Sequence, residues 1–232
     1  MQGRPGDEAP LLAALTAAGV EPSGVGITFP EDPSIPFDPT GLFDGSFGAA
    51  AVTSYDGAAR LQEFYDLESG IPLGPDGSVA LEDESGVIAA APGMGIWVMR
   101  STLENEDHRI ALALTLIAIA DGLASCRDDA VECGVVLGDS GIADRYGDGL
   151  VWSVNAFNAT LWPAPDGAFA IDEQALTDAV AQAVAVGLAA SAPSADDLID
   201  RRVLDLALAN LPANVDLVGS SWTPIEVQLP LE

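Results

Sequence analysis

Ser140 and His108 are the pair of residues that this sequence offers as candidates for nucleophilic catalysis by a serine. Ser140 lies in the run VVLGDSGIADRYGDG (Val135–Gly149), where an apolar stretch ends in Gly-Asp-Ser. A serine hydroxyl needs an adjacent base to attack a carbonyl near neutral pH, and histidine is the usual base. The chain has a single histidine, in the acidic run ENEDHR, and it has no lysine, which excludes a Ser-Lys pair. A serine esterase-type hydrolase that uses Ser140 and His108 is therefore one functional hypothesis.

The run around Ser140 resembles the first sequence block of the SGNH, or GDSL-type, esterases, in which a strand ends in Gly-Asp-Ser and leads into a helix. The resemblance covers about fifteen residues. It implies a nucleophile at Ser140, oxyanion donors that include a later Gly and Asn, and an Asp-x-x-His block near the C-terminus. This sequence departs from that pattern, because no histidine follows position 108 and no asparagine stands in a Gly-x-Asn-Asp context.

The tetrapeptide GDSG (Gly138–Gly141) is similar to the nucleophile segment of trypsin-like proteases. Here Ile142 and Ala143 replace that family's Gly-Pro, and no Ala-Ala-His-Cys segment precedes it. Short motifs of this kind recur by chance. We therefore expect a strand that ends in a turn at this point, with Asp139 and Ser140 capping the next segment.

Three acidic residues near this turn, Asp139, Asp144 and Asp148, are candidate ligands for calcium, since hard cations take several carboxylate and carbonyl oxygens. Their spacings of five and four residues do not match the order of ligands in an EF-hand loop. A solvated turn is the favoured interpretation, with a divalent cation as one candidate partner. We expect no cofactor.

The only two cysteines, Cys126 and Cys133, bracket the hexapeptide RDDAVE. They could form a local disulfide in an oxidising compartment, or they could be two independent buried thiols. Two cysteines and one histidine do not complete a tetrahedral zinc site in one chain without carboxylates, so we expect no zinc.

The charge balance limits the classes of partner. The chain has 36 acidic residues against eight arginines, and its formal net charge is −28. Phosphate binding requires clustered cationic side chains, so nucleic acids and anionic lipid surfaces are disfavoured. Protein partners, self-assembly, divalent cations and high-salt solvent stay open. We expect an extracellular, surface or virion location, with the cytoplasm of a halophile as the alternative.

The longest apolar run is IALALTLIAIA (Ile110–Ala120), which spans eleven residues. A bilayer requires about twenty. We therefore expect this run to lie in the protein core, as a helix, and we expect no membrane insertion.

A segment rich in proline and glycine, residues 20–48, carries apolar side chains that recur along its length. Proline limits regular structure to short pieces. A free linker would not carry so many aromatic residues, so we expect an arm that docks on its own domain or on a neighbouring subunit. The aromatic residues assigned to this docking are Phe29, Phe37, Phe43 and Phe47.

The remaining patterns predict an α+β fold, with an antiparallel or mixed sheet, two C-terminal amphipathic helices and the Pro/Gly-rich N-terminal arm. Residues 1–70 would form an N-terminal helix, the arm and a short helix, and residues 71–232 the main α+β domain of one continuous globular unit. The predicted helices are 8–18, 54–66, 110–120, 172–190 and 194–210. The predicted strands lie within 71–91, 95–100, 133–141, a hairpin over 150–172, and 215–232.

Four tryptophans lie in or beside predicted strands, and we expect them to fill the core, with a carbohydrate or lipid pocket as the alternative. They are Trp97, Trp152, Trp162 and Trp222. No catalytic group of residues is complete, so the leading hypothesis is a non-enzymatic structural or interaction protein, a subunit of a surface, extracellular or virion assembly. A binding domain for an apolar, lipid-like ligand is the alternative, ahead of the esterase.

Overall fold

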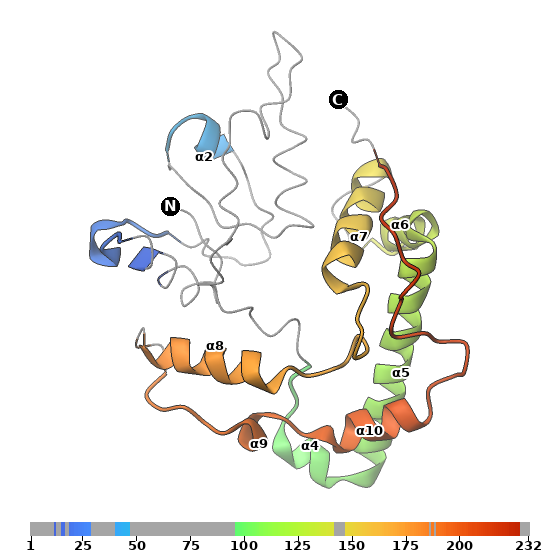
Figure 1. Ribbon diagram of the computed structural model, residues 1–232. Coiled ribbons are helices and arrows are strands. Elements are labelled where there is room, and N and C mark those ends of the chain that lie inside the picture. Colours follow the sequence, from blue (N-terminus) through green and yellow to red (C-terminus); the bar gives the residue numbers. More distant parts are fainter. Residues whose placement is uncertain are drawn as a thin grey trace.

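The computed structural model describes residues 12, 15–16, 19–28, 40–46, 96–141, 147–185, 187 and 189–227 (Figure 1). This part of the chain is mostly helical. Its elements are the 3-10 helix η1 (Pro22–Gly24) and the helices α2 (Thr40–Phe43), α4 (Arg100–Glu104), α5 (Glu106–Asp128), α6 (Ala130–Asp139), α7 (Gly147–Leu161), α8 (Glu173–Ala185), α9 (Ala195–Leu198) and α10 (Arg201–Ala209).

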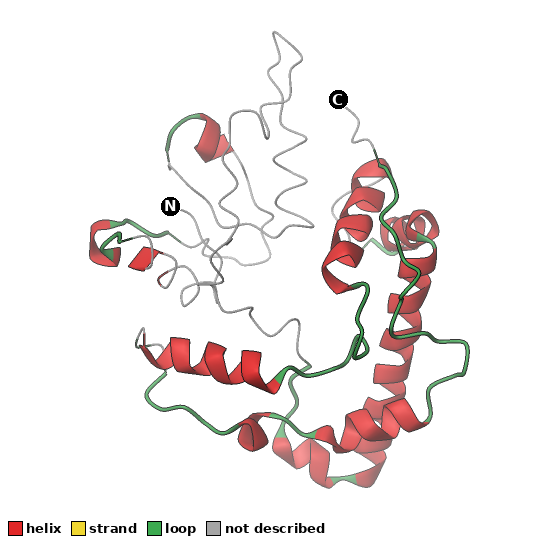
Figure 2. Cartoon of the chain, in the orientation of Figure 1, coloured by secondary structure: helices red, strands yellow, loops and turns green. Residues whose placement is uncertain are grey.

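The predicted α+β sheet fold is wrong, because the described residues form helices and loops and no sheet (Figure 2). The run assigned to a strand at 133–141 lies mostly in α6, and the first half of the predicted hairpin is α7. Residues 215–227, a predicted strand region, are loop. The physical reason is that short apolar runs rich in valine have no distinguishing period, and helix packing outweighs their preference for strands. The strands predicted within 71–91 lie outside the described residues.

Helix α5 is the element against which most of the described helices pack. Asn105 caps its first turn by accepting a hydrogen bond from the backbone N–H of His108. Helices α4 and α10 pack on its N-terminal part, while α6 and α7 contact it farther along (Figure 1). Two small clusters result, one of Leu103, Ala113, Val203 and Ala207, and one of Ala120, Ala124 and Val215.

Helices α6 and α7 form the most extensive helix pair in the described part of the chain. Gly134 allows their close approach, since a Cβ atom there would lie 2.9 Å from Cγ2 of Val151. Ala130, Cys133 and Val154 form the core of this pair. The buried side chains are mostly small, which leaves many larger apolar side chains at the surface.

The two predicted C-terminal helices exist with shorter bounds. The first is α8, and the second is divided into α9 and α10 at Ile199 and Asp200. Ser194, the first residue of the predicted helix 194–210, is the N-cap of α9, and its N–H and hydroxyl both donate to Oδ2 of Asp197. Asp200 caps α10 by accepting from the N–H of Arg202.

The described parts of the N-terminal region agree with the prediction of short regular pieces. Residues 12, 15 and 16 are helical, and Gly19 ends that segment with a φ of 73°. Helix η1 and helix α2 are the pieces of the arm that the structure describes. Phe43 is the last residue of α2, whereas Phe29, Phe37, Phe47 and the predicted helix 54–66 lie outside the described residues.

Candidate functional site

The helices hold Ser140 and His108 apart. His108 is an exposed residue in the first turn of α5, and Ser140 is the C-cap of α6, where its hydroxyl donates to the carbonyl of Leu137 at 2.6 Å. Helix α5 rises about 30 Å between His108 and its last residue, and α6 is only about 15 Å long. Even a helix that doubled back along α5 would leave Ser140 beyond hydrogen-bond reach of His108. The helices therefore do not bring Ser140 and His108 together as a nucleophile and its base.

The acids near Ser140 are spread over helix ends. Asp139 is the last residue of α6 and Asp148 lies in the first turn of α7, both exposed, and Asp144 is outside the described residues. Among the residues that the structure describes, no group of three or more side chains could hold a metal ion.

Cys126 and Cys133 form a disulfide, the first of the two alternatives for this pair, with an S–S distance of 2.00 Å. The bond connects the end of α5 to the middle of α6. Asn158 of α7, which is 1% exposed, donates from Nδ2 to the carbonyl of Cys126 at 2.9 Å. The three helices are thus joined at one point by covalent and polar contacts.

Arg127, Trp162 and Asp216, which we name the Arg127 junction, connect the end of α5 to the segment that follows α10. The side chain of Arg127 is 7% exposed, and its guanidinium donates to the carbonyl and to Oδ2 of Asp216. The pKa of Asp216 is lowered mainly by the backbone N–H of Val218, with further contributions from the N–H of Gly219 and the charge of Arg127, against a smaller opposing effect of burial. These contacts occupy the polar groups of Arg127, so this junction is structural.

Helix α5 exposes large apolar side chains on the face that no described helix covers. Leu114 is 62% exposed, Ile110 46% and Ile119 37%. With the small exposed residues Ala118 and Gly122, these three form what we name the α5 apolar face. The prediction that the run Ile110–Ala120 is a helix is confirmed, but only part of it lies in the core. Burial could not be predicted because it depends on the neighbours of α5 and not on its own sequence.

Helix α5 has 23 residues and is the one helix in the described part of the chain that could cross a membrane by length and composition. Of its most apolar window, 17% is buried inside the protein. A membrane that covered the exposed face of α5 would also meet the helices that pack on its other face. Helix α10 packs there with the exposed, charged residues Arg201, Arg202 and Asp205.

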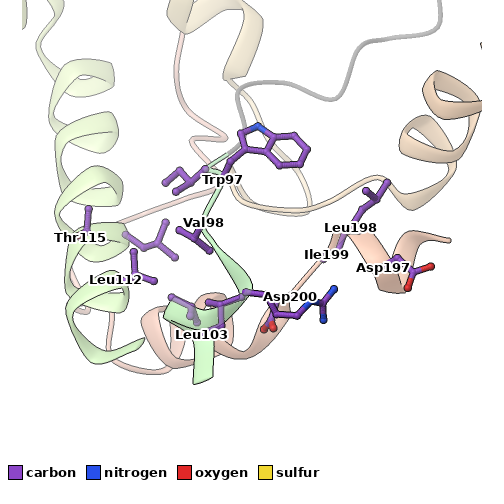
Figure 3. Close-up of a pocket in the computed structure, with 13 residues that line it drawn as sticks. Trp97, Val98, Leu103, Leu112, Thr115, Asp197, Leu198, Ile199 and Asp200 are labelled. Carbon is purple, nitrogen blue, oxygen red and sulfur yellow. The ribbon is translucent and has the colours of Figure 1, made fainter. Parts of the chain in front are cut away.

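A partly open pocket of about 210 Å³ lies between α4, α5 and the segment that joins α9 to α10 (Figure 3). Its apolar lining comes from all of these elements: Leu112 and Leu116 of α5, Leu103 of α4, and Ile199 and Val203 of the α10 region are examples. Trp97 and Val98, which precede α4, line a further side. We name this site the α4–α5–α10 pocket.

Arg100, Asp197 and Asp200 are the charged residues that line this pocket. The pKa of Asp200 is lowered mainly by the guanidinium of Arg202, and that of Asp197 mainly by the hydroxyl of Ser194, with Arg100 a smaller cause for both. Both carboxylates are therefore ionised near neutral pH. Of the arginines in the described residues, Arg100 is the one whose guanidinium has no hydrogen bond or ion pair.

The sequence did not indicate this pocket. Trp97 is 80% exposed, so the expectation that every tryptophan fills the core is wrong for it, whereas Trp162 is 3% exposed as expected. Comparisons with protein-family models, with curated proteins and with solved structures find no match for the chain.

Proposed function

We propose that this protein is a non-enzymatic assembly subunit that pairs with a second copy of itself through the α5 apolar face. The observation that carries the proposal is that α5 is apolar on both sides, although one side is already packed against α10 and α7. A helix that is hydrophobic all round is normally covered all round. We therefore expect a partner to cover the exposed apolar face of α5.

The charge distribution favours a second copy on this face. A chain with a net charge of −28 repels itself over most of its surface. Between Ile110 and Ala120, however, α5 contains no charged residue. Two copies can approach there without bringing carboxylates together. The acidic residues Glu106 and Asp107 remain at the end of the helix, in water.

The order of side-chain sizes favours antiparallel pairing. Along the stripe Ile110, Leu114, Ala118 and Gly122, large residues come first and small ones last. An antiparallel copy would place the large residues of each helix against the small residues of the other. It would also place Asp121 near the first turns of the partner helix, where Arg109 lies, whereas parallel pairing would oppose two Asp121 carboxylates. A twofold pairing of this kind uses the same patch on both copies.

A protein partner suits this face better than a bilayer. Asp121 interrupts the apolar sequence of α5, and a carboxylate at membrane depth costs about 2.5–3.5 kcal/mol. The packed helix α10 would carry Arg201, Arg202 and Asp205 into the lipid as well. The disulfide supports an oxidising compartment, so we place the assembly outside the reducing cytosol, at a surface, in the extracellular space or in a virion.

The size of the face sets the expected strength. Helix α5 is about 35 Å long and about 10 Å wide, so each copy would bury roughly 350 Å² along it. Stable complexes bury about 800 Å² per partner. We therefore expect a concentration-dependent dimer with a dissociation constant of roughly tens of micromolar.

Sedimentation equilibrium on the full chain between 1 and 200 µM tests the proposal. We expect a monomer–dimer equilibrium, and Leu114→Asp should weaken it at least tenfold because it places a carboxylate on the face. Leu208→Asp is the matched control, since Leu208 is an exposed leucine of α10 outside the face. A chain that stays monomeric up to 200 µM, or that responds equally to both variants, would contradict the proposal.

Cysteine crosslinking separates the two directions of pairing. Mixed Ala111→Cys and Gly122→Cys chains should form a disulfide-linked heterodimer in the antiparallel arrangement. Preferential self-linking of Ala111→Cys would instead show parallel pairing. If the chain floats with zwitterionic lipid vesicles and Leu114→Asp abolishes this flotation, the α5 apolar face binds a membrane and the proposal of a protein partner is wrong.

A further inference from the structure

The α4–α5–α10 pocket is a second feature without a role in the proposed assembly, and it is built from different residues. One part of its lining is apolar and comes from Leu103, Leu112, Leu116 and Val203, whereas the other part is polar. Two of these, Leu103 and Val203, belong to the buried core of the α4–α5–α10 group, and the other two pack against it. The interior is therefore a fixed surface of the folded helices.

The volume of the pocket limits the size of a ligand. An apolar cavity of about 150 Å³ holds a benzene molecule. The pocket here measures about 210 Å³ and is partly open, so it has room for a molecule of two fused rings. Ligand sites of this type are mostly apolar, with a few polar groups that set orientation.

The charges at the pocket select against charged ligands. Asp200 is paired with Arg202, and Asp197 accepts hydrogen bonds from Ser194. An anion on Arg100 would lie within the Coulomb range of both carboxylates and would meet the negative field of the whole chain. A cation would be attracted by Asp197 and Asp200, but Arg100 would repel it at short range and would find no acceptor for its N–H groups. A neutral molecule avoids both penalties.

Arg100 supplies the polar contact for such a molecule. A guanidinium has five N–H donors, and none of those of Arg100 is used within the part of the chain that the structure describes. Arg100 precedes the buried residue Leu103 in the same short helix, which fixes its position beside the apolar interior. A carbonyl oxygen on the ligand could accept from it.

We infer that the α4–α5–α10 pocket binds a small, uncharged, largely aromatic or alicyclic molecule that carries one hydrogen-bond acceptor directed at Arg100. Trp97, which lines the pocket and is otherwise exposed, would cover part of the ligand (Figure 3). The inference does not depend on the assembly through α5, because its carrying residues lie outside the α5 apolar face.

A set of three naphthalene probes tests the inference on the full chain at pH 7. 2-Acetylnaphthalene is neutral and has an acceptor, 2-ethylnaphthalene lacks the acceptor, and 2-naphthoate is an anion. By titration calorimetry at chain concentrations below self-association, we expect 2-acetylnaphthalene to bind with a dissociation constant of about 0.1 mM. 2-Ethylnaphthalene should bind roughly tenfold more weakly, because it forms no hydrogen bond to Arg100. 2-Naphthoate should bind more weakly still.

Two variants with matched controls locate the binding. Arg100→Met should reduce the affinity for 2-acetylnaphthalene to that of 2-ethylnaphthalene and leave the latter unchanged, whereas Arg201→Met, outside the pocket, should change neither. Thr115→Trp should block the pocket from its exposed edge, while Thr177→Trp is its control. Both threonines are exposed and donate to the carbonyl four residues earlier in their helices.

The outcomes separate clearly. Tighter binding of 2-naphthoate than of 2-acetylnaphthalene would overturn the preference for neutral ligands. Equal affinities of the acetyl and ethyl probes would overturn the role of Arg100. Absence of binding of every probe up to 1 mM, or binding that Thr115→Trp leaves unchanged, would overturn the site itself.

Discussion

The guanidinium of Arg127 lies 4.8 Å from the centroid of the Trp162 ring, in a position where its side chain is 7% exposed. Arg127 comes from the last turn of α5, and Trp162 directly follows α7. The guanidinium also donates to Asp216, beyond α10. A single side chain thus connects the end of α5, the end of α7 and the segment after α10, and holds these three segments together.

Replacement of Arg127 should destabilise the protein more than replacement of an exposed arginine. We expect Arg127→Met to reduce the free energy of unfolding by about 2–3 kcal/mol, because the cation–π contact and the hydrogen bonds to Asp216 are lost at a buried site. Arg201→Met removes an exposed pair with Glu173 and should cost about 0.5 kcal/mol or less. Urea unfolding followed by circular dichroism measures both. Equal losses would show that the junction is no stronger than a surface ion pair.

Gly219 lies against the same junction and tolerates no side chain. A Cβ atom there would lie 2.6 Å from Cε3 of Trp162 and 3.0 Å from Cδ of Arg127, and its φ is +61°. We expect Gly219→Ala to cost about 3 kcal/mol, the sum of overpacking and of a left-handed backbone that disfavours alanine. Gly187 has a φ of +80° and open space around it, so Gly187→Ala isolates the backbone effect, at about 1–2 kcal/mol. Thermal unfolding measures the loss of stability in both variants. If Gly219→Ala loses no more stability than Gly187→Ala, close packing around Gly219 does not contribute.

The sequence allowed local features to be predicted and left tertiary ones undetermined. The predicted helix 8–18 ends before Gly19, the predicted helix 194–210 begins at its cap Ser194, and a local Cys126–Cys133 bond is one of two alternatives. All three features depend on residues near one another in the chain, and the structure has the stop at Gly19, the cap at Ser194 and the bond. The strands predicted over α6 and α7 are wrong because the stability of this helix pair comes from packing between helices, such as that of Gly134 on Val151.

The two candidate sites show the same limit. The exposure of Leu114 depends on which face of α5 the helix α10 covers, and the sequence of α5 alone contains apolar residues on both faces. The pocket near Arg100 forms where segments about one hundred residues apart meet, so no local motif marks it. The motif at Ser140 is, by contrast, local in the sequence, but α5 and α6 hold this serine away from His108, the one histidine of the chain.

Removal of the disulfide should destabilise the junction of α5 and α6. We expect the double variant Cys126→Ser and Cys133→Ser to lose about 2–3 kcal/mol of unfolding free energy, as the chain-entropy model gives for so short a loop. Reduction of the wild-type chain should lower its urea midpoint as far as the double substitution lowers it. The double variant is the control, since the reductant should leave its midpoint unchanged. A midpoint of the wild-type chain that is insensitive to reduction would contradict a stabilising role for this bond.

Asp216 should make the stability of the protein depend on pH in the acid range. Its pKa in the folded protein is lowered, first by the N–H of Val218, so the folded state favours the ionised carboxylate. The resulting stabilisation is complete above the unfolded pKa of about 3.9 and is lost as the pH falls through the lower folded value. The difference in urea midpoint between wild type and Asp216→Asn should therefore be constant from pH 7 to about 5 and decline below about 4. Because hydrogen bonds from backbone N–H groups are its main source, most of that difference should persist in 0.5 M salt. A difference in urea midpoint that grows on acidification would contradict a lowered pKa of Asp216 in the folded protein. A difference that vanishes in salt would show that the charge of Arg127, and not the backbone N–H groups, is the main source of the stabilisation.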